Sequence, residues 1–193
     1  MGYRRQAMAC AVAVLTPVIG ARAQSQSVTA SATPPAAPAL GDVAPSFQAT
    51  ATDSTGRAIP VSLNDVRGKV VVLAFYPLDR SQGCTAELDK FRDEFASLFG
   101  RDVVVWPTSV DTLASHASWA REAHFPFAMI ADPQAQVARA YGSAVPGRPY
   151  FNRTVFVIGR DGRIAYEDLR FGALSEDAYH RLAAAVSAAK NGQ

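Results

Sequence analysis

The chain has 193 residues, of which 49% are hydrophobic and 19% are charged, as is typical of a soluble globular protein. The net charge of +2 is small and the basic residues are scattered, which argues against nucleic acid as a partner. The length leaves room for one ordinary domain preceded by a leader.

The first residues predict an export signal that is not part of the fold. Arg4 and Arg5 precede an uncharged, mostly apolar run from Ala7 to Gly20, which is too short to cross a bilayer. The sequence Ala-Arg-Ala then matches a small-x-small cleavage site. We expect a signal peptide over residues 1–23 and a periplasmic mature protein that begins at Gln24. An uncleaved anchor is the alternative, and both Sec and twin-arginine export stay open.

Removal of this leader changes the charge and the cysteine count. The leader carries Arg4, Arg5 and Arg22 but no acidic residue, so the mature charge is +2 less three, or −1. Cys10 also leaves, and Cys84 becomes the only cysteine. A lone thiol in an exported protein suggests a reactive group or an intermolecular partner, whereas a buried inert cysteine is the alternative.

The first elements of the mature chain are a tether and three strands. Residues 24–40 are rich in Ser, Thr, Ala and Pro and predict a flexible tether before a domain over residues 41–189. Short strands are predicted at Phe47–Ala51 and Val61–Ser62. The run Val70–Tyr76 is continuously apolar and β-branched, which predicts a strand buried on both faces.

Strands and helices alternate along the rest of the chain. Apolar residues at helical spacing predict a helix over Cys84–Leu98. The later predicted elements are a strand at Val103–Trp106, a helix capped by Asp111 and ending near Ala123, a strand at Phe127–Ala131, a helix opened by Asp132 and Pro133 and ending at Tyr141, a hairpin of Thr154–Ile158 and Arg163–Glu167, and a helix from Ser175 to Ala189. This order predicts an α/β fold with a mixed central sheet flanked by helices.

The loop that follows the buried strand is the predicted site, because ligands of such sheets bind beyond the carboxyl ends of central strands. Cys84 lies in the first turn of the predicted helix, where free N–H groups and the helix dipole stabilise a thiolate. The hydroxyl of Ser81 can both donate and accept beside the sulfur, which suits a neutral peroxide oxygen. Pro77 ends the strand and would exclude water from one side of the sulfur.

The run FYPLDRSQGCTAEL resembles the bacterioferritin-comigratory-protein branch of the peroxiredoxins, whose motif is Pro-x3-Thr/Ser-x2-Cys. The segment from Asp111 to Trp119 and the arginine-led strand Arg153–Ile158 are similar to that family as well. The resemblance covers roughly residues 41–189. It implies a thioredoxin-like fold and the reduction of hydrogen peroxide and organic hydroperoxides in antioxidant defence.

The resemblance also implies a role for each matching residue. Cys84 is the peroxidatic nucleophile and becomes a sulfenic acid. Ser81 orients the peroxide, and Pro77 shields the site. Arg153 pairs with the thiolate and with the charge that develops during the reaction. Glu87 supports the site by orienting Arg153.

The chain departs from the family pattern at two positions. Ser81 stands where threonine is usual, which loses a methyl group that restricts the rotamer. Asp89 stands where many members of this branch carry a resolving cysteine. We therefore expect a one-cysteine cycle in which an external thiol, from a thioredoxin-like protein or a small molecule, reduces the sulfenic acid. The sequence leaves a homodimer open.

No cofactor or metal is expected, because His116, His124 and His180 have no ligand spacing among them. Two other functions stay open at this point. A thiol-disulfide oxidoreductase usually needs two cysteines at C-x-x-C spacing, but position 87 is Glu. A non-catalytic redox sensor could keep the same fold, and a protonated Cys84 that forms no sulfenic acid would favour it.

Overall fold

The computed structural model describes residues 1–2 and 36–192, so nearly all of the predicted signal peptide and most of the predicted tether lie outside the described residues. The chain divides into two units, Met1–Ser31 and Ala32–Gln193, and the elements below belong to the second. Among the residues described, no helix combines the length and the apolar composition that a membrane crossing requires.

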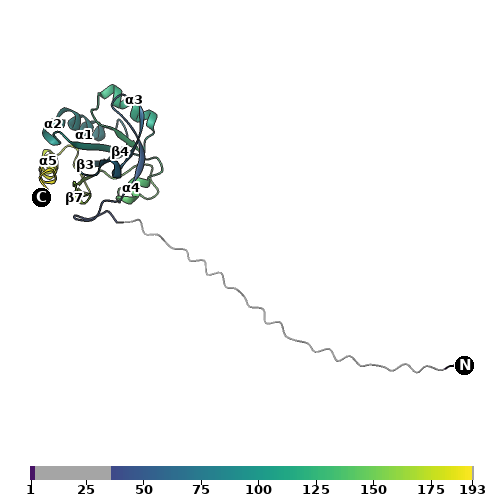
Figure 1. Cartoon of the computed structure of the whole chain (residues 1–193). Helices are drawn as coiled ribbons and strands as arrows, with labels where there is room; N and C mark the ends of the chain where they lie inside the picture. Colours follow the sequence, from purple (N-terminus) through teal and green to yellow (C-terminus); the bar gives the residue numbers. More distant parts are fainter. Residues whose placement is uncertain (3–35, 193) are drawn as a thin grey trace. The chain divides into compact units, whose positions relative to one another are not determined.

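The second unit is built on one seven-stranded mixed sheet in the order β2-β1-β5-β4-β3-β6-β7 (Figure 1). The strands β3, β4 and β5 are parallel, and antiparallel pairs extend the sheet on both sides. The strands are β1 (Gln48–Thr52), β2 (Ala58–Ser62), β3 (Val70–Phe75), β4 (Val103–Ser109), β5 (Met129–Ala131), β6 (Thr154–Ile158) and β7 (Ile164–Asp168). The predicted α/β fold with a mixed sheet is confirmed.

Helices cover both faces of this sheet. They are α1 (Gln82–Asp93), α2 (Phe95–Leu98), α3 (Leu113–Ala123), α4 (Gln136–Ala140) and α5 (Glu176–Lys190), and a short 3-10 helix, η1 (Leu63–Val66), follows β2. In Figure 1, α1 and α3 lie on one side of the sheet and α4 lies on the other.

The central strand β3 is fully buried because its two faces enter two different cores. Val70, Val72 and Ala74 pack with side chains of α1, α3 and α5, whereas Val71, Leu73 and Phe75 pack with side chains of α4 and the outer strands. Each buried Val, Leu or Phe side chain of this strand contributes roughly 1.5–3 kcal/mol when it leaves water. The strand is therefore held from both sides up to its carboxyl end, where the predicted site begins.

The predicted helix Cys84–Leu98 is two helices, because the chain turns at Glu94. There φ is −108° and ψ is 21°, outside the helical range. The turn brings Phe95 against Phe127, with ring centroids 6.5 Å apart, and Phe99 against Phe91, with centroids 5.1 Å apart. Packing against the segment that leads into β5, far along the chain, thus overrides a continuous helical pattern.

The predicted cap of α3 is wrong by one residue. Thr112, not Asp111, is the N-cap, and its side chain accepts a hydrogen bond from the Ser115 N–H. Asp111 instead accepts a hydrogen bond from the backbone N–H of Asp79, which lies in the loop after β3. The Asp111 carboxylate fits a local capping pattern, but it binds the backbone of a loop 32 residues earlier in the chain.

The predicted opening of α4 is also displaced. The helix begins at Gln136, beyond the predicted first position at Pro133. The Asp132 carboxylate nevertheless accepts hydrogen bonds from the N–H groups of Gln136 and Ala138, at 2.7 and 2.8 Å. An extra turn separates the acidic residue from the helix whose N–H groups it satisfies.

The residues just before β1 are attached to the domain through the β6–β7 hairpin. The Gly41 N–H donates to the Ile164 carbonyl, the Ile164 N–H donates to the Asp42 carbonyl, and Val43 pairs antiparallel with Arg163. Pro38 is buried. The packed domain therefore begins a few residues before position 41.

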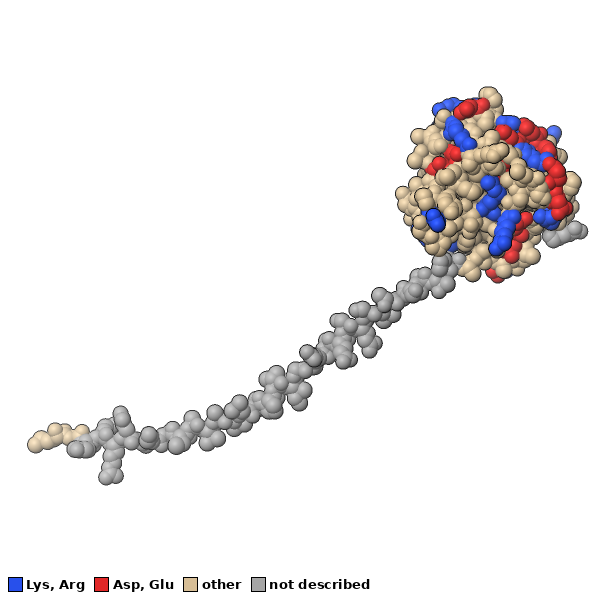
Figure 2. Space-filling view, turned by 180° about the vertical axis from the view of Figure 1, so that it is seen from behind, with Lys and Arg blue, Asp and Glu red and all other residues tan. Residues whose placement is uncertain are grey.

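Charged side chains are mixed on the face of the molecule drawn in Figure 2. Acidic side chains gather along one edge of that face, and basic side chains lie beside them. Lys90, for example, is paired with both Glu94 and Glu176. Exposed pairs of this kind add little to stability, typically less than about 1 kcal/mol each.

Candidate active site

The site begins where β3 ends, as the sequence predicts. A loop over residues 76–81 connects the strand to α1, and Cys84 lies in the first turn of that helix. Its thiol is fully buried in the core between α1 and the sheet. The first turn of a helix stabilises an anion through its unpaired N–H groups.

Sheet register brings Arg153 to the sulfur from 69 residues away. Strand β6 runs antiparallel to β3 with Thr154 opposite Phe75, so the residue before β6 lies beside the carboxyl end of β3. The Nη2 of Arg153 donates to Sγ of Cys84 at 3.3 Å. The two residues that the resemblance assigns to thiolate chemistry are thus in direct contact.

Glu87 completes this contact from the same face of α1, three residues after the cysteine. Its carboxyl is fully buried, and Oε2 accepts a hydrogen bond from Nη1 of Arg153. The other oxygen, Oε1, has no hydrogen-bond partner among the described residues. Burial raises the pKa of Glu87 to about 7, although the positive charge of Arg153 acts in the opposite direction.

The guanidinium of Arg153 therefore joins two groups of α1. Its side chain is 18% exposed, with one nitrogen on the sulfur and one on the carboxylate. Burial alone lowers the pKa of Arg153, but the charges of Glu87 and Cys84 outweigh it and the pKa is raised. The cation is fixed beside the sulfur, where negative charge is stabilised.

Ser81 and Pro77 lie in the loop, but neither reaches the sulfur through a hydrogen bond in the described part of the chain. The Ser81 hydroxyl donates to the Leu78 carbonyl at 3.2 Å, and the residue is exposed. Pro77 is half-buried and directly follows the last buried residue of the strand run, Tyr76. The loop therefore presents both residues ahead of Cys84 without fixing them to it.

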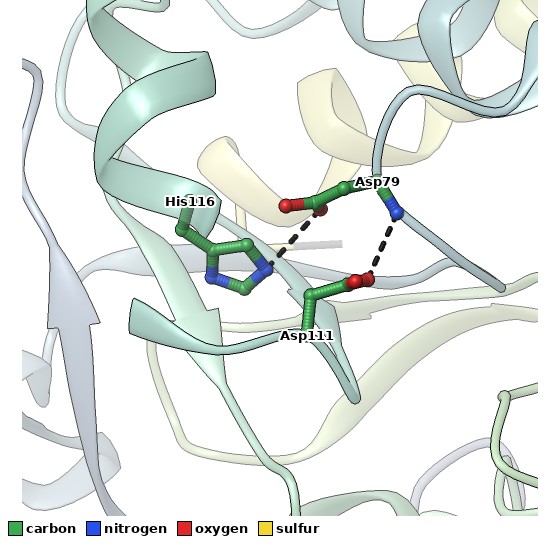
Figure 3. A group of neighbouring side chains, drawn as sticks. All are labelled: Asp79, Asp111 and His116. Atoms are coloured by element: carbon green, nitrogen blue, oxygen red, sulfur yellow. Dashed lines mark hydrogen bonds and ion pairs between the residues drawn. The ribbon is translucent and has the colours of Figure 1, made fainter. Parts of the chain in front are cut away.

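The contacts that hold this loop could not be predicted from the sequence. Figure 3 shows Asp79 from the loop, Asp111 from the connection between β4 and α3, and His116 from α3 turned toward one another. The Asp79 N–H donates to Oδ2 of Asp111 at 2.8 Å, and Nε2 of His116 lies 3.3 Å from Oδ1 of Asp79. The motif comparison singled out the segment of Asp111 and His116, but nothing local indicated Asp79 as its partner.

These three side chains offer donor atoms within 4.8 Å of one another, a grouping that could hold a metal ion. The sequence did not predict this grouping. Each of its three contributing groups already has hydrogen-bond partners in the protein, including the hydroxyls of Tyr76 and Ser109. We therefore treat the grouping as a hydrogen-bond network.

Comparison with known proteins identifies what this arrangement is similar to. A family model described as the AhpC/TSA family matches residues 40–167. A protein of Coxiella burnetii described as a Bcp peroxiredoxin is 36% identical over 132 residues, which cover 65% of this chain and 85% of that protein. The mitochondrial thioredoxin-dependent peroxide reductase of Bos taurus is 33% identical over 151 residues, or 73% of this chain and 58% of that protein.

Solved structures agree with the family model. The crystal structure of Enterococcus faecalis AhpC superposes with a TM-score of 0.70 at 26% identity, and the match covers 81% of this chain and 97% of that one. The peroxidoxin BcpB of Mycobacterium tuberculosis superposes with a TM-score of 0.65 at 28% identity, covering 78% and 97%. The expected thioredoxin-like fold is confirmed.

Proposed function

Because the chain belongs to the AhpC/TSA family of peroxiredoxins, we propose that Cys84 is the nucleophile with which it reduces peroxides. The protein is a thiol-dependent peroxidase, an oxidoreductase that acts on peroxide. The observation that carries the assignment to Cys84 is the 3.3 Å hydrogen bond from Arg153 to its sulfur, made by a cation that is itself held by buried Glu87.

The first half of the reaction forms one bond and breaks another. The Cys84 thiolate attacks one peroxide oxygen, an S–O bond forms, and the O–O bond breaks. The sulfur is oxidised to a sulfenic acid, and the departing oxygen takes a proton to become water or an alcohol. Arg153 stabilises the negative charge as it moves from sulfur to the departing oxygen.

The loop residues shape the approach of the peroxide. Pro77 shields the sulfur from water, and the hydroxyl of Ser81 accepts from or donates to the peroxide. In the resting protein that hydroxyl donates to the Leu78 carbonyl, so it must turn when a peroxide enters. Serine makes this rotation easy because it lacks the methyl group that restricts threonine.

The second half of the reaction requires another molecule. Cys84 is the only cysteine beyond the predicted leader, and Asp89 occupies the position of the resolving cysteine. An external thiol attacks the sulfenic acid, releases water and leaves a mixed disulfide, which a second thiol resolves. The name of the Bos taurus relative supports a thioredoxin-type reductant, and a small thiol is the alternative.

We propose in addition that the enzyme acts in the periplasm after its leader is removed. The basic start, the short apolar run and the Ala-Arg-Ala site over residues 1–23 support this proposal. Mass spectrometry of the protein secreted by its host would test it, and a mature chain that still begins at Met1 would contradict cleavage.

The disulfide oxidoreductase and the redox sensor are not favoured, because the relatives are peroxide reductases and the chain has no second cysteine at C-x-x-C spacing. Replacement of Cys84 by serine tests the proposed function directly. We expect Cys84→Ser to lose peroxide consumption entirely, and the wild-type chain to gain one oxygen atom at Cys84 after one equivalent of peroxide. Unchanged consumption by the variant would refute the proposal.

A further inference from the structure

The loop between β3 and α1 is attached to helix α3 and to the connection that leads into it from β4. Asp79 makes the inner attachment, with its side chain only 4% exposed. Its Oδ1 accepts from the Tyr76 hydroxyl at 2.7 Å, and its Oδ2 accepts from the Ser115 hydroxyl at 2.6 Å. Its own backbone N–H donates to Asp111.

The donors and acceptors of this network match when Asp79 is ionised. Burial raises the pKa of Asp79, but hydrogen bonds from His116, Ser115 and Tyr76 lower it by more, so the net pKa is lowered. Nε2 of His116 also lies 2.9 Å from the Ser109 hydroxyl and 3.2 Å from the Tyr76 hydroxyl, so the ring contacts the same network.

Arg80 makes the outer attachment to the same helix. Its guanidinium donates to Ser118 and Glu122 and lies 5.9 Å from the Trp119 ring. The backbone of Arg80 has a φ of +56°, in the left-handed region that a side chain disfavours. A loop with such a residue needs outside contacts to keep its shape, and the contacts on either side of Arg80 supply them.

We propose that Asp79 is a positioning residue for peroxide reduction, which holds the loop so that Pro77 and Ser81 stand correctly ahead of the Cys84 sulfur. This inference rests on the proposed function and deepens it. A thiolate reacts with a peroxide only when the two oxygens lie in line with the sulfur, and the loop determines that approach. Attack on a small alkylating agent makes no such demand on the loop.

Comparing the reaction with peroxide to the reaction with an alkylating agent therefore distinguishes an effect on loop position from an effect on the thiolate. In Asp79→Asn, the negative charge is lost and an NH2 group replaces one of the two oxygens that accept from Tyr76 and Ser115, so one of these hydrogen bonds must reverse or be lost. The inner attachment is therefore weakened while the size of the side chain is kept. The Asp89→Asn variant is the matched control. It makes the same chemical change on α1, where Asp89 is paired with Arg92 of the same helix.

The experiment measures two rate constants of Cys84 in each variant, oxidation by hydrogen peroxide and alkylation by iodoacetamide. For Asp79→Asn we expect oxidation to slow by about tenfold or more and alkylation to stay within about twofold of wild type. For Asp89→Asn we expect both rates to match wild type. Ser115→Ala, which removes one donor to Asp79, should slow oxidation less. Its matched control is Ser97→Ala on α2, which removes an exposed hydroxyl that donates to the Glu94 carbonyl and should leave the rate unchanged.

The outcomes distinguish this inference from the proposed function. An Asp79→Asn variant that is oxidised at the wild-type rate would overturn the positioning role and leave the peroxidase intact. Equal losses in oxidation and alkylation would overturn it too, because they would indicate an effect on the thiolate itself. A wild-type chain that does not react with peroxide would overturn both. If Asp79→Asn does not fold, a Ser115→Ala rate equal to wild type refutes the role.

Discussion

At Glu87, burial and a neighbouring cation act on one carboxyl in opposite directions. The carboxyl is fully buried, one oxygen is unpaired within the described residues, and the other accepts from Arg153. Because desolvation is the larger effect, the pKa rises from the ordinary value of 4.5 to about 7. Near neutral pH, the carboxyl group that holds Arg153 therefore exists in both protonation states.

This shift predicts how the stability of the protein depends on pH. The unfolded chain releases the Glu87 proton near pH 4.5, whereas the folded chain keeps it up to about pH 7. The folded state binds more protons in that interval, so the free energy of unfolding falls as pH rises through it, by on the order of 3 kcal/mol. Above pH 7 the contribution of this group is constant.

The measurement is urea unfolding of wild type and Glu87→Gln at several pH values between about 4 and 8. We expect wild type to lose stability relative to Glu87→Gln as pH rises, since glutamine does not titrate. Glu176→Gln, which alters an exposed carboxylate, should follow wild type. Parallel curves for wild type and Glu87→Gln would contradict the raised pKa.

Replacing Arg153 by lysine tests whether the two-pronged guanidinium, and not the positive charge alone, is needed for rapid oxidation of Cys84. Its guanidinium spans two partners, with Nη1 on Glu87 and Nη2 on Cys84, whereas a lysine ammonium is a single point. We expect Arg153→Lys to slow oxidation of Cys84 by about 10- to 100-fold in stopped-flow measurements, although the charge is kept. Arg160 is exposed, and its guanidinium donates to the Gly68 carbonyl, so Arg160→Lys should leave the rate unchanged.

At the scale of elements, the sequence predicted those parts whose pattern is local. The continuous apolar sequence of β3 predicted a buried strand, because both of its faces are buried. The apolar residues of α1 recur at helical spacing, because one face of that helix is buried. The break at Glu94 could not be predicted in this way, because it depends on Phe127, which lies in the connection between α3 and β5. The sequence pattern predicted Asp111 as a helix cap. Its actual contact with the Asp79 N–H could not be predicted, because it forms only when the loop after β3 folds against it.

The residues of the candidate site also differ in whether a local sequence pattern could predict them. Cys84 and Ser81 follow from the strand-loop-helix pattern, because the loop is short and the first helical turn is fixed by its neighbours. Arg153 came from the resemblance alone, since its place beside the sulfur depends on the β3–β6 register. The contacts of Asp79 depend on hydroxyl and ring positions on α3, for which the sequence has no periodic signal.

Gly83 leaves room for the Arg153 guanidinium beside the first turn of α1. A methyl group at this position would lie 3.2 Å from Nη2 of Arg153, which must then move by a few tenths of an ångström. We expect Gly83→Ala to slow oxidation of Cys84 several-fold while raising the free energy of unfolding by up to about 1 kcal/mol, because alanine favours a helix. Slower oxidation together with lower stability would contradict this separation.

The matched control lies one residue earlier. Gln82 is exposed and opens the same helix, so Gln82→Ala changes the first turn without approaching the arginine. Stopped-flow oxidation and thermal unfolding of the two variants should therefore differ. Only Gly83→Ala should lose rate.

At the scale of the whole molecule, the segment before β1 stabilises the edge of the sheet. β7 is the last strand on its side, and residues 41–44 bond to its first residue and to the turn before it. Arg163 also donates from its side chain to the Gly41 carbonyl at 2.8 Å, and Pro45 accepts from the Tyr141 hydroxyl at 2.9 Å. An uncovered edge strand is prone to pair with other chains.

Two truncated chains test this role of the segment. A chain that begins at Ala36 keeps all of these bonds and should unfold in urea like a chain that begins at Gln24. A chain that begins at Ser46 loses three backbone hydrogen bonds, those between Gly41 and Ile164, Ile164 and Asp42, and Ala44 and Gly162. We expect its free energy of unfolding to fall by about 2–4 kcal/mol, because each lost bond costs about 1 kcal/mol. We also expect it to self-associate, because the edge is exposed.

Since the segment lies at the end of the sheet opposite the carboxyl end of β3, oxidation of Cys84 in the fraction that stays folded should keep its wild-type rate. Equal stability of the two truncated chains would show that the segment does not hold the edge.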